Sequence, residues 1–146
     1  MKRTAFLLLV VFCLSACASQ GATQLASNTP PPEGYRETIA AHVSQNFFDP
    51  YSVRDASISS PLRNTQKMYW NVFEAKPDWY VCMKANAKNR MGGYTGQTLD
   101  IYMFQNGRFI GTHTKPTGAG YENSTTAVLC RDAQYVPFPE IEGKSS

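Results

Sequence analysis

The segment of this sequence with the most evident binding chemistry is a glycine-rich stretch, residues 86–96 (NAKNRMGGYTG). Its glycines permit positive φ angles and a close approach of the backbone to a ligand. Backbone N–H groups in such a loop can bind an anion with help from neighbouring cations, and the tyrosine can stack on a sugar ring or a peptide side chain. The candidate binding loop therefore consists of Asn86, Lys88, Asn89, Arg90, Gly92, Gly93, Tyr94 and Gly96. The spacing is neither that of a P-loop nor that of a dinucleotide fingerprint. The alternative interpretation is a long turn between strands whose charges are solvated.

Residues that often perform catalysis are few and poorly placed for it. Asp100 and His113 are predicted cross-strand neighbours, but no G-x-S-x-G motif places a serine beside the histidine. An ion pair worth roughly 0.2–1 kcal/mol is the preferred interpretation of this pair. The two histidines, His42 and His113, do not have the spacing of metal ligands. We expect a protein without enzymatic activity, metal or cofactor, and a hydrolase is the weakest alternative.

The first residues of the chain have the pattern of an export signal. Lys2 and Arg3 form a short positive region, and the apolar run Ala5–Leu14 follows. This run is shorter than the roughly 20 apolar residues that a membrane-spanning helix needs. Its length and flanks are those of a secretory signal peptide.

The residues that end the apolar run are Leu14, Ser15, Ala16 and Cys17, and they resemble the lipobox of bacterial lipoproteins. The resemblance implies that residues 1–16 are a lipoprotein signal peptide and that Cys17 is acylated. A diacylglycerol on the thiol and a further chain such as palmitate on the amine would anchor the protein stably, whereas one chain binds membranes only marginally. Ala18 is not the aspartate that favours inner-membrane retention, so the expected location is the periplasmic face of the outer membrane. The alternative is an ordinary signal peptide that contains a cysteine.

Charge and length limit the possible partners. The chain has 146 residues, and removal of Lys2 and Arg3 leaves 12 basic against 11 acidic residues, a net charge of +1. This balance provides no bulk attraction for nucleic acid. The expected partners are the membrane, through the acyl chains, and an unidentified envelope protein or glycan.

Two cysteines remain after Cys13 is removed with the signal peptide and Cys17 is acylated. Cys82 and Cys130 are an even pair in an oxidising compartment, and both lie in predicted strands. They are not a C-x-x-C motif and no histidine cluster accompanies them, which favours a structural disulfide over a redox or metal pair. Closing the intervening loop would stabilise the fold by about 4 kcal/mol in the chain-entropy model.

The mature chain divides into three parts. Residues 17–34 contain small and polar residues followed by three prolines, and they predict a flexible tether. We expect one globular domain over residues 35–138 and a disordered tail over residues 139–146. The domain is predicted to be α+β, with one N-terminal helix packed on an antiparallel sheet of about five strands. The helix spans about 35–47, where apolar residues recur every four positions, and the strand candidates are Val53–Ser59, Lys67–Ala75, Trp79–Ala85, Thr98–Gln105, Arg108–Thr114 and Thr126–Arg131.

A hairpin is the most definite local prediction. Asn106-Gly107 between two apolar runs is the signature of a type I′ turn, which pairs Gln105 with Arg108 and continues outward. One face of the hairpin then carries Leu99, Ile101, Met103 and Ile110, and the other carries Tyr102, Phe104 and Phe109 with Asp100 opposite His113. A single helix covers one face. The aromatic face, the candidate interaction face, is then either covered by the tail and loops or open to a partner.

Two segments carry a second resemblance. Phe48-Asp-Pro-Tyr-Ser52, together with Trp79–Asn89 and Gly92–Gly96, looks like a group of small, largely uncharacterised proteobacterial envelope lipoproteins. That group has a D-P-x-S turn after a helix and a C-x-x-x-N-A-K-N-x-x-G-G-Y-T-G segment. The similarity covers about half of the mature chain, and no activity accompanies it.

The expected function is that of a non-enzymatic, outer-membrane-anchored periplasmic interaction module that uses the 86–96 loop. The alternative is a glycan- or anion-binding module, or an inhibitor of a lytic enzyme, that uses the same loop. A small-ligand module would show a pocket lined by Lys88, Arg90 and Tyr94, whereas a protein-binding module would show an exposed aromatic surface.

The first prediction concerns the anchor. We expect Cys17→Ala to release the protein from membranes while the folded domain remains intact, because the acyl chains alone provide membrane affinity. Fractionation of cells, with mass spectrometry of the mature N-terminus, measures this. Unchanged membrane association of the variant would contradict the prediction.

Overall fold

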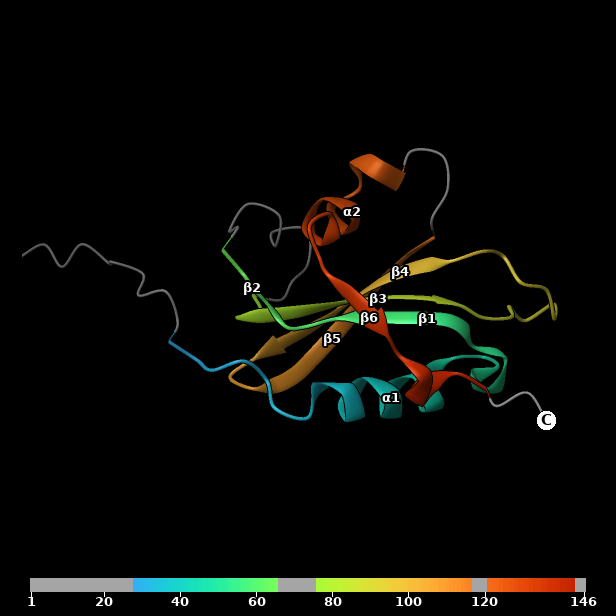
Figure 1. Cartoon of the computed structure of the whole chain (residues 1–146), viewed down its shortest axis with the longest axis horizontal. Helices are drawn as coiled ribbons and strands as arrows, with labels where there is room; N and C mark the ends of the chain where they lie inside the picture. Colours follow the sequence, from blue (N-terminus) through green and yellow to red (C-terminus); the bar gives the residue numbers. More distant parts are fainter. Residues whose placement is uncertain (1–27, 66–75, 117–120, 144–146) are drawn as a thin grey trace, which may run out of the picture.

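The computed structural model describes residues 28–65, 76–116 and 121–143, and it confirms the α+β class (Figure 1). The main helix lies against an antiparallel sheet in which the described residues form six strands in the order β5-β4-β3-β1-β6, with β2 also paired to β3. The elements are α1 (Tyr35–Asn46), η1 (Pro50–Ser52), β1 (Arg54–Ser59), β2 (Leu62–Arg63), β3 (Trp79–Asn86), β4 (Thr98–Gln105), β5 (Arg108–Pro116), η3 (Tyr121–Asn123), α2 (Thr125–Cys130), β6 (Tyr135–Pro137) and η4 (Pro139–Ile141). The predicted strand Lys67–Ala75 lies outside the described residues.

The predicted helix is confirmed to within one residue at its end. Ile39 and Val43, one turn apart, are the buried residues of α1 and point toward the sheet. The chain leaves the helix at Phe47, which is extended, and Pro50 then starts the short turn η1. The helix therefore ends before the Asp-Pro pair, as the steric restriction on the residue before proline requires.

The sheet has an apolar core on each face, and Figure 1 shows α1 on one side of the sheet and α2 on the other. The core on the α1 side is formed by Ile39, Val43, Val53, Ala56, Ile58, Val81, Met83, Ala85, Tyr102, Phe104, Phe138 and Ile141. The core on the α2 side is smaller and is formed by Tyr80, Cys82, Leu99, Ile101, Met103, Leu129, Cys130 and Ala133.

The predicted last strand, Thr126–Arg131, is wrong, because this segment forms the helix α2. The β-branched residues Thr126 and Val128 favour a strand on propensity. The side chain of Ser124 overrides that preference by accepting a hydrogen bond from the N–H of Ala127 at 3.1 Å, which is an N-cap. The helix then buries Leu129 and Cys130 against the sheet.

The predicted hairpin turn is confirmed, but its register changes after the first two pairs. Asn106 and Gly107 have φ angles of 51° and 75°, as a type I′ turn requires. A bulge then pairs Met103 with Gly111 instead of Ile110, so that Asp100 faces Thr114. A shift of one residue moves every later side chain to the other face. The predicted pairing of Asp100 with His113 is therefore wrong.

The candidate interaction face of Tyr102, Phe104 and Phe109 is not an exposed surface. Tyr102 and Phe104 are each 1% exposed in the α1-side core, and Phe109 is half-buried against them. The rings of Tyr102 and Phe109 also contact the imidazole of His42 from α1, with ring centroids 5.6 and 5.1 Å away. The helix α1 thus covers the aromatic face of the hairpin. The opposite face, which α1 was expected to cover, is covered by α2.

The predicted domain limits, residues 35 and 138, are too narrow at both ends. At the N-terminal side, the carbonyl of Thr29 accepts hydrogen bonds from Trp79 Nε1 at 3.1 Å and Arg63 at 3.4 Å, and Pro32 is buried. The last part of the predicted tether is therefore packed on the domain.

The predicted disordered tail, residues 139–146, is wrong for residues 139–143. The turn η4 inserts Ile141 into the α1-side core. The carboxylate of Glu142 then accepts a hydrogen bond from the N–H of Ala56 at 2.7 Å, and the N–H of Gly143 donates to Val53 at 3.0 Å. These bonds attach the C-terminal segment to β1 and to Val53, the residue that precedes this strand.

The predicted disulfide between Cys82 and Cys130 is confirmed, with Cα atoms 5.9 Å apart. It connects β3 to α2 across the smaller core. Because it closes a loop of 48 residues, we expect Cys82→Ala with Cys130→Ala to lower the free energy of unfolding by about 4 kcal/mol. Urea unfolding followed by tryptophan fluorescence measures the loss.

Reduction provides the control for this prediction. Dithiothreitol should lower the stability of the natural chain to a similar degree and leave the double variant unchanged. Equal stability of the oxidised chain and the double variant would show that α2 is held by packing alone.

Candidate functional site

Asn89 organises the tip of the candidate binding loop. Its side-chain Oδ1 accepts hydrogen bonds from the N–H groups of Met91 at 2.9 Å and Gly93 at 3.1 Å, and its carbonyl accepts from Gly92 at 3.0 Å. Gly92, with a φ of 79°, provides the backbone conformation that this turn requires. Three successive N–H groups are therefore already bonded within the loop. The predicted anion cradle of free backbone donors is not present at this tip.

Ser52 joins the loop to the turn η1. Its Oγ donates to the carbonyl of Asp49 at 2.7 Å and accepts from the N–H of Lys88 at 2.8 Å. Its carbonyl accepts a hydrogen bond from the hydroxyl of Tyr94 at 2.9 Å. The two segments that carried the lipoprotein resemblance, residues 48–52 and 79–96, therefore meet at one serine.

The ring of Tyr94 is occupied by the protein's own cations. The guanidinium of Arg54 lies 3.6 Å from the ring centroid and the ammonium of Lys88 lies 5.8 Å from it. Cation–π contacts of this kind stabilise the aromatic side chain in place. Tyr94 is 38% exposed, and it supports the loop more than it offers a free stacking platform.

The predicted loop residues thus separate into two groups. Asn89, Gly92 and Tyr94 shape or attach the loop, and Gly96 has a φ of 97° that favours glycine. Asn86, at the end of β3, has a buried Oδ1 that lacks a hydrogen-bond partner in the described part of the chain. Arg90 and Gly93 are exposed, whereas Lys88 is partly buried and its ammonium lies over the ring of Tyr94. No ion pair involves either cation among the described residues.

Three large apolar side chains near this loop are strongly exposed. Met91 at the loop tip is 93% exposed, Tyr51 in η1 is 88% exposed, and Phe48 before η1 is 64% exposed. We call the exposed side chains of Phe48, Tyr51, Arg90 and Met91 the loop end. Side chains of this kind, when grouped, mark interaction surfaces. Sequence reasoning missed Phe48, Tyr51 and Met91 as site residues, although the two aromatic residues that flank an Asp-Pro turn were a visible signal.

The loop end lies at the opposite end of the sheet from the point where the chain enters the domain. Thr29 is bonded to Trp79, the first residue of β3, whereas the loop begins at Asn86, the last residue of that strand. Eight residues of extended strand span about 23 Å. Figure 1 shows the N-terminal segment approaching one end of the sheet and the loop between β3 and β4 at the other.

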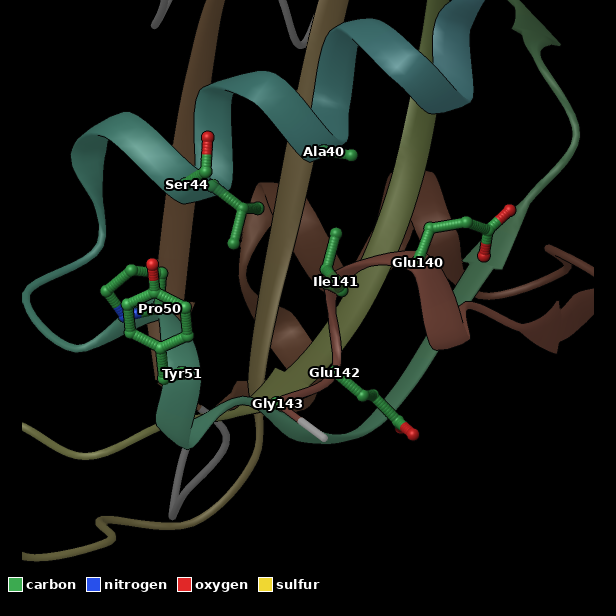
Figure 2. Close-up of a pocket in the computed structure, with 9 residues that line it drawn as sticks. Ala40, Ser44, Pro50, Tyr51, Glu140, Ile141, Glu142 and Gly143 are labelled. Atoms are coloured by element: carbon green, nitrogen blue, oxygen red, sulfur yellow. The ribbon is translucent and has the colours of Figure 1, made fainter. Parts of the chain in front are cut away.

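A pocket of about 450 Å³ lies beside Tyr51, between α1, η1 and the C-terminal segment (Figure 2). Its walls include Ala40 and Val43 from α1, Pro50 and Tyr51 from η1, and Ile141 from η4. Lys88, Arg90 and Tyr94 do not line it. This pocket therefore lies on the neighbouring side of η1 and is distinct from the one expected for a small-ligand module at the loop.

The groups that could perform acid–base chemistry are separated. Asp100 is fully buried on the α1 side, while His113 pairs with Ile101, whose side chain faces α2. Burial raises the pKa of Asp100 to about 6, although hydrogen bonds from Thr114 and Thr98 oppose the rise. Burial and the charge of Lys115 lower the pKa of His113. The described residues contain no group of three metal-ligating side chains.

Cys17 lies outside the described residues, so its acylation stays a prediction. Among the residues that are described, no helix is long and apolar enough to cross a membrane.

In comparisons with known proteins, the chain matches no protein-family model, no curated protein and no solved structure. The functional interpretation therefore rests on the chemistry of the site itself.

The buried carboxyl of Asp100 generates a testable pH dependence. Its folded-state pKa lies above its ordinary value, so the folded state holds a proton that the unfolded state has lost between about pH 4 and pH 6. The contribution of Asp100 to stability therefore falls as pH rises through that window. A shift of about two pKa units corresponds to roughly 3 kcal/mol. Asp100→Asn should be more stable than the natural chain at pH 7 and should lack this dependence.

Urea unfolding at pH 4.5 and pH 7 measures the effect. Exposed Asp132 provides the matched control, because Asp132→Asn should leave the difference between the two pH values unchanged. If Asp100→Asn and the natural chain respond identically to pH, the buried carboxyl is not the cause.

Proposed function

We propose that this protein is a lipoprotein held at the periplasmic face of the outer membrane by acylated Cys17, and that it is a non-enzymatic module that binds an envelope protein through the loop end. The observation that carries the proposal is the exposure of Phe48, Tyr51, Arg90 and Met91 on two segments of the chain that are joined at Ser52. Such a group of exposed apolar side chains with a cation among them has the composition of a protein-binding surface.

The geometry of the domain supports this arrangement. The chain enters at Thr29, at the end of the sheet opposite the loop end. An extended tether from residue 17 to residue 28 would add up to roughly 3 Å per residue between the membrane and the domain. The loop end would then face away from the membrane toward a partner in the periplasm.

The glycan- or anion-binding alternative uses the same loop, and two observations disfavour it. The N–H groups of Met91, Gly92 and Gly93 already donate to Asn89, and the ring of Tyr94 is occupied by Arg54. The separation of Asp100 from His113 on opposite faces of the sheet likewise gives no support to a hydrolase.

Site-specific photo-crosslinking in intact cells tests the proposal. A photoreactive amino acid at Met91 should form an adduct with one discrete envelope protein, whereas the same group at exposed Arg108, at the opposite end of the sheet, should not. Equal adducts at both positions would show non-specific contact. Absence of any adduct at Met91, Tyr51 and Phe48 would contradict the proposed surface.

Substitution of the two loop cations complements the crosslinking experiment. We expect Lys88→Ala with Arg90→Ala to weaken the Met91 adduct severalfold, since Arg90 is exposed next to Met91 and neither cation forms an ion pair among the described residues. Each substitution should change stability by no more than about 0.5 kcal/mol, because the backbone bond from Lys88 to Ser52 survives. A variant that unfolds would instead assign these cations a structural role.

A further inference from the structure

The pocket beside Tyr51 has apolar walls and an open mouth. Figure 2 shows Ile141 and Tyr51 on opposite sides of the pocket beneath α1, with the carboxyl groups of Glu140 and Glu142 directed outward from its rim. Ala40 contributes a methyl group from the helix, and Val43 adds a buried branched side chain. A volume of about 450 Å³ lies within the range of sites that hold small ligands or large side chains.

The walls of the pocket are held by contacts between lining residues and their neighbours. Arg36 of α1 forms a two-pronged hydrogen-bonded ion pair with Glu140, with both contacts at 2.8 Å, and its guanidinium lies 4.8 Å from the ring centroid of Phe138. Gly143 approaches the backbone carbonyl of Tyr51 so closely that a side chain at this position would overlap it. The helix, the turn and the C-terminal segment are thereby held apart at a set spacing, so the pocket is preorganised.

The segments that form the pocket carry more acidic than basic residues, and two of the acidic residues line the pocket. Glu37 lies on the same helical stripe as Ala40 and Ser44, and Asp49 precedes Pro50. Glu140 and Glu142 belong to the lining, and one carboxylate oxygen of Glu142 accepts the hydrogen bond from the N–H of Ala56. Arg36 is the basic residue in the segments 35–51 and 139–143, and it is committed to Glu140. Burial opposes ionisation of Glu140 slightly, but hydrogen bonds from its own backbone and from Arg36 lower the pKa of its carboxyl.

We propose that this pocket binds a basic segment of a protein partner, which inserts one apolar or aromatic side chain between Tyr51 and Ile141 and places flanking lysines or arginines near Glu37, Asp49 and Glu142. The inference rests on the proposed function and adds the chemistry of the partner. Charge complementarity selects a cationic segment over an acidic one. The apolar walls select a segment with a large hydrophobic anchor over a purely polar one.

The cations of the loop do not change this assignment. Arg54 and Lys88 are directed at the ring of Tyr94, and neither lines the pocket. Tyr51 belongs both to the loop end and to the pocket wall, so a partner that contacts the loop can extend into the pocket.

Three synthetic peptides of equal length test the proposal against the purified full-length chain in detergent micelles. GKKFKKG carries both the charge and the anchor, GEEFEEG reverses the charge, and GKKGKKG removes the anchor. We expect the first to bind at least tenfold more tightly than the other two, and added salt to weaken its binding. Fluorescence titration measures the affinities, and amide chemical shifts locate the contact.

Two variants on one helix provide the matched control. Ala40→Phe fills the pocket and should reduce the affinity of GKKFKKG about tenfold or more, whereas Ala41→Phe, on an exposed neighbouring position, should leave it unchanged. Tyr51→Ala is a second test that does not depend on a new core side chain, because Tyr51 is 88% exposed. It should also weaken binding while circular dichroism stays the same.

Several results would overturn the inference. These are equal binding of the three peptides, preference for the acidic peptide, no binding at millimolar concentration, or full affinity in Ala40→Phe. Self-association that Ala40→Phe abolishes would assign the pocket to a second copy of this chain, and shifts caused by a chitin oligosaccharide instead of the peptide would assign it to a glycan. A Met91 adduct in cells that persists after any of these results would leave the proposed function standing and remove the pocket assignment alone.

Discussion

The structure depends on one constraint, which is that both faces of the central strands are apolar and both must be covered. Val81 and Cys82 are consecutive residues of β3, point to opposite faces, and are each fully buried. If only one face of the sheet were covered, the apolar side chains on the other face would lie in water. On one face the twelve-residue helix α1 provides the cover by ordinary packing.

The other face is covered by a helix that could not persist alone. The helix α2 has six residues, and isolated helices of that length are not stable in water. Its N-cap at Ser124 and the disulfide from Cys130 to Cys82 hold it against the sheet. The disulfide is therefore part of the smaller core, and it adds a covalent link to the small apolar area that this short helix buries.

The sequence predicted local features well, because each depends on neighbouring residues. The four-residue recurrence of apolar side chains located α1, Asn106-Gly107 located the hairpin, and the two remaining cysteines located the disulfide. Features that depend on distant residues were missed. The bulge opposite Met103 was also missed, although a glycine inside a strand, here Gly111, often marks a bulge. That bulge alone separates Asp100 from His113. The cap at Ser124 was visible in the sequence, but the β-branched residues after it favoured a strand.

The candidate site was predicted only in part, because some of its features depend on residues that are distant in the chain. The glycine-rich loop was recognised from composition, yet its role changed once Asn89 and Ser52 were seen to use its backbone donors and its tyrosine. The pocket could not be predicted, since it is formed by three segments that are far apart in the chain. Residues assigned to a disordered tail form one of its walls.

The closeness of Gly143 to Tyr51 has a practical consequence for anyone who labels this protein. A fluorescent protein or affinity tag fused after Ser146 would begin three residues from the wall of the pocket. Such a fusion would shield the pocket and the adjacent aromatic residues by its bulk. A pull-down with the fused protein would therefore recover few binding partners. A label inserted near Arg108, at the far end of the sheet, would leave that surface open.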